Sequence, residues 1–210
     1  MPQTESSHEQ NARISIDGVI FTIKDNKLYV LLKKREKEPF KDAFELFGGI
    51  VFENETAEEG LVRKLNELLP NKKLFFTQFH TFTNPKRDPR QRTISIGFLT
   101  LINEENAKNL QEWHSCTELP KLAFDHAEII QRAKDHLKKN ISKSITKQLL
   151  PDKFPLNKLQ ETYELIEEKK YDNRNFRKRI LSSELIKETK KREKDVSHRP
   201  AKLYMFTNKI

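Results

Sequence analysis

Residues 47–70 place a glycine pair directly before a charged segment, and this stretch is the one best suited to chemistry. Gly48 and Gly49 follow an apolar run and predict a loop, because glycine tolerates backbone conformations that other residues avoid. A helix is expected from about Thr56, since four apolar residues recur at the spacing of one helical stripe: Ala57, Leu61, Leu65 and Leu68. Arg63, Lys64 and Glu67 fall in the middle of this helix.

Positions 64, 67 and 68 decide which chemistry this helix supports, because they stand at i, i+3 and i+4 and share one face. They supply one ammonium (Lys64), one carboxylate (Glu67) and one isobutyl group (Leu68). Mg2+ requires hard oxygen ligands in near-octahedral order, and an ammonium repels a divalent cation. We therefore expect Lys64 to pair with Glu67, and we expect no metal and no cofactor at this site.

Charge is distributed unevenly along the 210-residue chain, whose formal net charge is +9. Residues 143–210 hold 18 Lys and Arg against 10 Asp and Glu, a net of +8, which leaves +1 for residues 1–142. A basic segment appended to a nearly neutral one is typical of a nucleic-acid-binding module. The alternative interpretation of this charge is a solvated, lysine-rich helical surface.

Several classes of protein are disfavoured. Cys116 is the only cysteine, so an intrachain disulfide is impossible and we expect a structural or surface thiol in a reducing compartment. Residues 1–11 are polar, predict a disordered tail and lack the apolar core of a secretory signal. No apolar run is long enough to span a bilayer. We expect a cytoplasmic protein without membrane contact.

The segments around the glycine loop predict strands followed by a closing helix. β-branched and aromatic residues favour strands at residues 13–23 (with a break at Asp17-Gly18), 28–32, 74–83 and 93–102. Apolar spacing predicts a helix at residues 125–137. His126, near its start, permits a catalytic interpretation. The favoured interpretation is structural, with Asp125 capping the helix and His126 hydrogen-bonded.

Residues 84–92 predict a loop with two prolines and four basic side chains. Guanidinium forks match phosphate oxygens, so this loop is a candidate anion-binding rim near the ligand cleft. The alternative is a solvated hairpin tip. The basic residues are Lys86, Arg87, Arg90 and Arg92.

The polar stretch 141–147 marks the expected boundary between residues 12–142 and a small module at 143–210. An amphipathic helix beginning near Pro155, a turn and a helix capped by Asp172 predict a helix-turn-helix, which a charged hairpin follows. The second helix presents its apolar residues to the first and its basic residues outward. Candidate base-contacting or groove residues are Asn173, Arg174, Asn175, Arg177 and Lys178. Candidate residues of the wing and of the chain end that follows it are Lys190, Lys191, Arg192, Lys194, His198 and Arg199.

The stretch 47–70 resembles the Nudix box, G-x5-E-x7-R-E-U-x-E-E-x-G-U. Matching residues are Gly49, Glu55, Arg63, Leu65 and Glu67. The departures are Lys64 and Leu68, which replace glutamates, and Pro70, which replaces the last glycine. In the Nudix family this helix face carries carboxylates that hold Mg2+ against a diphosphate. The resemblance therefore implies a Nudix scaffold, an α/β/α sandwich, that has lost hydrolysis and keeps no catalytic residue.

Further runs extend the resemblance to Nudix-related transcriptional regulators of the NrtR type, in which a Nudix-like sensor precedes a winged helix. They are RDPRQRTISIGFLTLI, LPKLAFDHAEII, LLPDKFPLNKLQETYELI, DNRNFRKRIL and HRPAKLYMF, and together the likeness covers residues 13 to 206. Family members are homodimeric DNA-binding repressors. One branch controls genes of NAD metabolism and responds to ADP-ribose or a related nucleotide, and another controls sugar utilisation and senses a sugar. We expect a palindromic double-stranded DNA operator, because its symmetry matches the two-fold symmetry of a dimer.

The resemblance implies that an effector binds near Gly48, Gly49, Arg63, Glu67, Arg87, Arg90 and Arg92. Binding would change the placement of the sensor relative to the DNA-binding half. One alternative is a divergent Nudix pyrophosphohydrolase with metal ligands from Glu53, Glu55, Glu58 or Glu59. The other is an RNA-binding protein, because electrostatic attraction to phosphates does not distinguish RNA from DNA.

Overall fold

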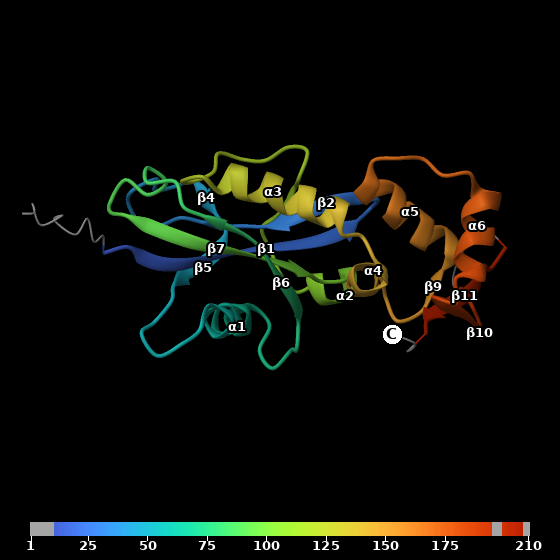
Figure 1. Cartoon of the computed structure of the whole chain (residues 1–210). Coiled ribbons are helices and arrows are strands. Elements are labelled where there is room, and N and C mark those ends of the chain that lie inside the picture. Colours follow the sequence, from blue (N-terminus) through green and yellow to red (C-terminus); the bar gives the residue numbers. More distant parts are fainter. Residues whose placement is uncertain (1–10, 195–198, 208–210) are drawn as a thin grey trace, which may run out of the picture.

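The computed structural model describes residues 11–194 and 199–207, apart from the side chains of residues 143 and 144. The expected tail at residues 1–11 therefore lies, except for Asn11, outside the described residues. A large mixed sheet occupies one end of the molecule, with helices on both of its faces, and a small helical unit with its own short sheet occupies the other (Figure 1).

The large sheet has the strand order β6-β7-β1-β2-β8, and β5 also pairs with β1. Its strands are β1 (Arg13–Lys24), β2 (Lys27–Leu31), β5 (Phe47–Ile50), β6 (Phe75–Phe82), β7 (Thr93–Leu101) and β8 (Trp113–Ser115). The central strand β1 is parallel to β7 and antiparallel to β2 and β5. Its 12 residues are enough for β5 to pair along its first half and β2 along its second.

The predicted break at Asp17-Gly18 is wrong, because β1 continues through both residues. A Cβ on Gly18 would lie 2.8 Å from the carbonyl oxygen of Phe47. The glycine thus allows β5 to approach β1, and a local sequence signal for a turn instead reports a close strand contact.

Alternate side chains of β1 enter two apolar clusters on opposite faces of the sheet. Ile16 and Ile20 pack on one face with α1 (Ala57–Leu68). Val19 and Phe21 pack on the other face with α3 (His126–Lys139). These layers form the α/β/α sandwich, to which β3 (Lys33–Lys34), β4 (Phe44–Glu45) and α2 (Glu104–Ala107) add short elements.

The C-terminal unit is a winged helix-turn-helix. It comprises α4 (Lys143–Leu149), β9 (Phe154–Pro155), α5 (Leu156–Glu167), α6 (Asn173–Ser182), β10 (Ile186–Arg192) and β11 (Lys202–Phe206), with sheet order β10-β11-β9. Phe176 and Ile180 of α6 are buried in the core of this unit, as the apolar spacing predicts. The polar stretch at residues 141–147 is largely helical, since α4 begins at Lys143.

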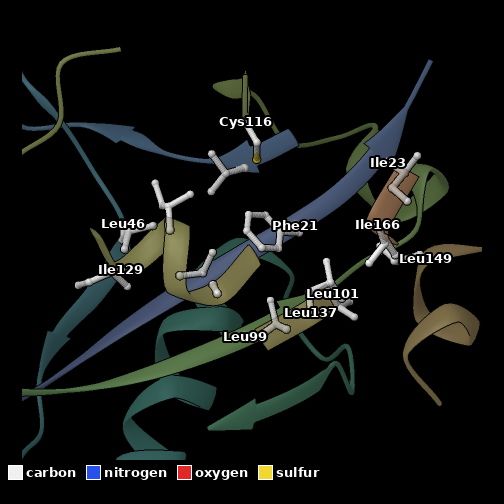
Figure 2. Packing of buried hydrophobic residues seen from close by; sticks show 14 of the residues in the cluster. Phe21, Ile23, Leu46, Leu99, Leu101, Cys116, Ile129, Leu137, Leu149 and Ile166 are labelled. Carbon is white, nitrogen blue, oxygen red and sulfur yellow. The ribbon is translucent and has the colours of Figure 1, made fainter. Parts of the chain in front are cut away.

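The sandwich and the winged helix share a continuous core. Leu149 of α4 and Ile166 of α5 belong to the same buried cluster as Ile23 and Leu101 of the sheet and Leu137 of α3 (Figure 2). A displacement of α3 should therefore also displace α5, because close-packed interiors transmit displacement. No helix within the described ranges has the length and apolar character needed to cross a bilayer.

Candidate functional site

A cavity of about 230 Å3 opens beside the glycine pair, between β1, β5, the 84–92 loop and the start of α3. Four of the predicted ligand residues line it: Gly48, Gly49, Arg87 and Arg90. Arg63, Glu67 and Arg92 are not among its lining residues. The wall also includes Arg13, Asp17, Arg35, Glu45, Phe124 and His126, none of which the sequence identifies as a ligand residue.

Gly48 is required by the packing of the two strands beneath the cavity. A Cβ at this position would lie 2.2 Å from the carbonyl oxygen of Ile16, which is closer than any non-bonded contact allows. At Gly49 a Cβ would meet only the Cε of Lys64, at 3.0 Å. The first glycine thus permits the strand pairing that forms the cavity floor, and the second keeps the floor open beneath a flexible side chain.

A buried ion-pair network forms the inner wall. The guanidinium of Arg87 donates to both carboxylate oxygens of Asp125, each at 2.8 Å, and to Asp17 Oδ2 at 3.0 Å. Ser95 donates its hydroxyl to the same oxygen of Asp17 at 2.6 Å. Burial works against the charge of Arg87, yet the hydrogen bond to Asp125 and the charge of Asp17 raise its pKa above the ordinary arginine value.

The carboxylate of Asp125 is therefore occupied by Arg87 instead of capping α3. Asp125 stands at the N-cap position, but its side chain makes no capping hydrogen bond. The prediction of a capping side chain is wrong, because a bidentate pair with a buried guanidinium competes for the same oxygens.

His126 is hydrogen-bonded within the fold, as expected. Its Nδ1 accepts a hydrogen bond from the backbone N–H of Leu46 at 3.1 Å, and its Nε2 lies 3.5 Å from Asp17 Oδ1. An imidazole that accepts at Nδ1 is neutral and carries its proton on Nε2. Burial lowers the pKa of His126, despite the opposing charge of Asp17, and so favours this neutral form.

The cavity mouth carries two guanidiniums against one aromatic ring. Arg35 and Arg90 lie 4.8 and 5.3 Å from the ring centroid of Phe124. Arg35 also pairs with Glu45, and Arg90 pairs with Asp88 at 2.7 Å, so both forks are oriented. Such an arrangement can present planar donors to an anionic ligand.

The Nudix-box helix does not fit the metal that the box pattern implies. The Nζ of Lys64 lies 2.9 and 3.1 Å from the two carboxylate oxygens of Glu67, so the predicted pair is present. Glu55 is held by Arg63 at 2.5 Å, and this hydrogen bond lowers the pKa of Glu55 to about 2. Within the described ranges, no group of three His, Cys, Asp or Glu side chains gathers to bind a metal.

Helix α6 has the character of a nucleic-acid-recognition helix. Asp172 caps it by accepting from the backbone N–H of Asn175 at 2.8 Å. All five candidate residues are exposed: Asn173, Arg174, Asn175, Arg177 and Lys178. Its buried side rests on α5, where the ring of Phe176 lies 5.8 Å from that of Tyr163. A helix anchored in this way can enter a DNA major groove with its cationic face outward.

Strand β10 places a second basic group beside this helix. Lys190, Lys191 and Arg192 are exposed on β10, and the exposed Lys194 lies two residues after the strand ends. Arg199 is exposed before β11, and His198 lies outside the described residues.

The residues that sequence reasoning missed had weak signals. Asp17 is a charged residue within a strand of apolar neighbours, which points to a buried partner, but nothing local identifies Arg87, 70 residues away. Arg35 lies in a charged run that gives no reason to separate it from its neighbours. Phe124 precedes the α3 helix with φ of 50°, a conformation that no sequence pattern announces.

Comparisons with known proteins agree with this geometry. Residues 13–133 match the NUDIX domain family, and residues 146–206 match the NrtR DNA-binding winged helix domain. The chain is 29% identical to the "ADPR responsive transcriptional repressor NtrR" of Acinetobacter baylyi, covering 98% of this chain and 86% of that protein. It is 42% identical to the ADP-ribose pyrophosphatase of Methanocaldococcus jannaschii over 56% of this chain and 70% of that one.

Among solved structures, Shewanella oneidensis NrtR complexed with a 27mer DNA superposes with a TM-score of 0.81. The identity is 27%, and the match covers 92% of this chain and 93% of that one. In this chain the Nudix domain precedes the winged helix, which is the order that the resemblance of the sequence implies. This chain belongs to the Nudix family, in the NrtR-like group that joins a Nudix domain to an NrtR-type winged helix.

Proposed function

We propose that this protein is a DNA-binding transcriptional repressor whose Nudix domain binds ADP-ribose or a related nucleotide and does not hydrolyse it. The observation that carries the proposal is the winged helix itself, which presents the cationic face of α6 to solvent and is fused to a sandwich with a guanidinium-rimmed cavity. The relatives that span nearly the whole chain support it, since one bears the name of an ADP-ribose-responsive repressor and another was solved with DNA.

The cavity suits a nucleotide diphosphate. Arg35 and Arg90 at its mouth supply the donors for an anionic ligand, and Phe124 between them supplies an apolar surface. Arg87 has a different part in this proposal. Its guanidinium is already shared between Asp17 and Asp125, so it holds the loop against the sheet and shapes the wall.

Helix α3 connects this cavity to the DNA-binding half. Its first residue, His126, lines the cavity, and its last turn contains Leu137 and Lys138. Leu137 packs in the cluster that includes Ile166 of α5, and Lys138 Nζ lies 2.6 Å from Glu168 at the end of α5. A 14-residue helix is about 21 Å long at 1.5 Å per residue, so one rigid element spans the distance.

In the proposed mechanism, ligand binding beside His126 changes the position of α3, which carries α5 and α6 with it. A homodimer places two α6 helices on successive half-sites of a palindromic operator, about 34–36 Å apart. Rotation of each winged helix on its sandwich alters that separation and weakens DNA binding. Linkage then requires DNA to weaken ADP-ribose binding by the same factor.

One observation favours a second function, hydrolysis of an ADP-ribose-like substrate, because a pyrophosphatase is 42% identical over the Nudix part. Two of the four candidate carboxylates are otherwise engaged here. Glu55 pairs with Arg63, Glu59 completes the capping box of α1, and Lys64 stands on the metal-facing side. Restoring Lys64→Glu and Leu68→Glu tests this point, and Mg2+-dependent hydrolysis is expected only in the double variant. Hydrolysis by the unaltered protein would overturn the non-enzymatic part of the proposal.

The experiment for the repressor proposal is fluorescence anisotropy of labelled DNA from upstream of the protein's own and neighbouring genes. Titration with protein at moderate salt, with excess nonspecific DNA present, should give sequence-selective binding. Weak, salt-sensitive binding that is indifferent to sequence would contradict the proposal. A duplex RNA of the same sequence serves as the control for the alternative nucleic acid.

A further inference from the structure

A second cavity lies where the Nudix domain meets the winged helix. It has a volume of about 420 Å3, larger than the cavity at Gly48, and within the range of small-molecule sites. From the Nudix domain it is lined by the start of β6, the end of β7 and α2. From the winged-helix unit it is lined by α4, the segment that follows α4, and the end of β11. In Figure 1, α2 and α4 lie side by side, and residues of both helices line this cavity.

Its lining combines cations with an apolar floor. Lys73 approaches from the Nudix side, and Lys147 and Lys153 from the winged-helix side. None of these three ammonium groups forms an ion pair with a carboxylate in the described part of the chain, and Asp152 is the one acidic residue in the lining. The lining therefore holds three exposed lysines against one acidic side chain.

Amide and aromatic groups complete the chemistry of the cleft. Asn103 and Asn106 of the α2 region offer side-chain amides, and Asn106 is itself oriented by a hydrogen bond from Lys72. Phe75 and Phe206, one from each domain, are also among the lining residues. An uncharged apolar molecule would leave the lysines without a counter-charge, and a bare inorganic anion would leave the rings uncovered.

We propose that this cleft is a second ligand site, distinct from the cavity at Gly48, which takes a small organic phosphate with a flat or apolar body. The phosphate lies among Lys73, Lys147 and Lys153, and the body lies against Phe75 and Phe206. Because both domains supply the contacts, the ligand binds the domain arrangement seen here in preference to others, and its affinity is coupled to that arrangement. The site does not depend on whether the Gly48 cavity binds ADP-ribose.

The experiment is amide NMR of the full-length, 15N-labelled protein titrated with AMP, with adenosine and with inorganic phosphate. AMP should shift the backbone amides of Asn103, Asn106, Lys147 and Gln148. A separate effect at Gly48 and Gly49 reports the other cavity, so the two sites are read independently in one spectrum. Adenosine and phosphate should each bind the cleft about tenfold or more weakly than AMP, since each lacks one half of the contacts.

Two double variants test the contribution of the cleft lysines. Each replaces two lysines by glutamates, one pair inside the cleft and the other outside it. Lys147→Glu with Lys153→Glu should weaken the AMP shifts at Asn103 and Asn106 about tenfold or more, because two ammonium–phosphate contacts become repulsions. Lys41→Glu with Lys121→Glu, two exposed lysines outside the cleft, should leave those shifts unchanged. The unperturbed amides of each variant show that it is folded.

Three outcomes would overturn the proposal. The first is the absence of AMP-dependent shifts at the cleft in the millimolar range. The second is equal binding of adenosine or of inorganic phosphate, which would exclude the organic phosphate class. The third is an equal loss of binding in the Lys41 and Lys121 control, which would indicate general attraction to a basic protein instead of a defined site.

Discussion

Arg87 and Asp125 form a bidentate ion pair, with both hydrogen bonds at 2.8 Å, that fastens the 84–92 loop to the first residues of α3. The same guanidinium reaches Asp17 in the central strand, so one side chain joins loop, helix and sheet. Its side chain is only 5% exposed, which places three charges in a region of little solvent. The cavity wall depends on this arrangement.

Substitution Arg87→Met should therefore destabilise the Nudix domain. The buried carboxylate of Asp17 and the partly buried one of Asp125 lose their counter-charge, and breaking a buried pair of this kind costs about 3–5 kcal/mol. Urea unfolding monitored by circular dichroism measures the loss. The control is Arg132→Met, because Arg132 and its partner Glu128 are 49% and 53% exposed and their pair should contribute about 1 kcal/mol or less. Equal effects of the two substitutions would show that burial does not govern this network.

His126 should make stability depend on pH. Its pKa in the fold is lowered by burial, so the unfolded chain binds more protons below the ordinary value of 6.5. The stabilisation is fully present above pH 6.5 and is lost as the pH falls below it, because protonation of Nδ1 breaks the hydrogen bond from Leu46.

The variant His126→Asn keeps an acceptor near Leu46 but cannot titrate, so its free energy of unfolding should fall less between pH 7.5 and pH 5.5. His136 has a pKa lowered by burial as well and contributes with the same sign. His136→Asn is therefore the control, and it should retain the part of the slope that His126 provides. Parallel slopes in the wild type and His126→Asn would contradict a buried neutral imidazole.

Several elements could be predicted because their signals are local. The α1 helix follows from apolar spacing, and its pair between Lys64 and Glu67 follows from the i, i+3 relation. Asp172 is found at the N-cap of α6 because short acidic side chains accept from free amides. In each case all the interacting groups lie within a few residues.

What could not be predicted involves contacts between distant segments. The Asp17–Arg87–Asp125 network closes separations of 70 and 38 residues, and no pattern in one sequence marks such partners. The same network explains why the Asp125 side chain does not cap α3, because both of its carboxylate oxygens accept hydrogen bonds from Arg87. The prediction of a strand break at Gly18 is wrong for a similar reason. Only the folded chain places the carbonyl oxygen of Phe47 against this glycine, and that contact explains why a glycine stands within the strand.

The proposed path through α3 predicts that the shared core couples the two domains. Ile166→Ala removes apolar contact between α5 and the cluster around Leu137, at a cost of about 2–5 kcal/mol in stability. The factor by which ADP-ribose weakens DNA binding should fall towards one in this variant. Measurements are made by anisotropy at a temperature where circular dichroism confirms the fold.

Leu159→Ala is the matched control for that experiment. Leu159 is also buried but belongs to the separate core of the winged helix. Its truncation should lower stability by a similar amount while the ADP-ribose response persists. If Leu159→Ala abolished the response and Ile166→Ala did not, α3 would not be the connection.

The exposed face of α6 should determine affinity for operator DNA. Arg174→Ala and Arg177→Ala should each weaken specific binding by about 1–3 kcal/mol if they contact base edges. Lys190→Ala on the wing should weaken all sequences alike and reduce the salt dependence by about one phosphate contact. Arg132→Ala, an exposed arginine of α3, should leave DNA binding unchanged. Thermal melting of all four variants should match the wild type, because every side chain involved is exposed or partly exposed.

The most direct test of the central claim is the effect of ADP-ribose on a preformed complex with operator DNA, followed by anisotropy without added Mg2+. The account predicts that ADP-ribose lowers anisotropy in a saturable manner and is recovered intact by chromatography. It also predicts that ribose 5-phosphate, which lacks the diphosphate, has little effect. A complex that persists at saturating ADP-ribose, or a release that occurs only as the nucleotide is cleaved, would contradict a repressor controlled by a non-hydrolysing Nudix domain.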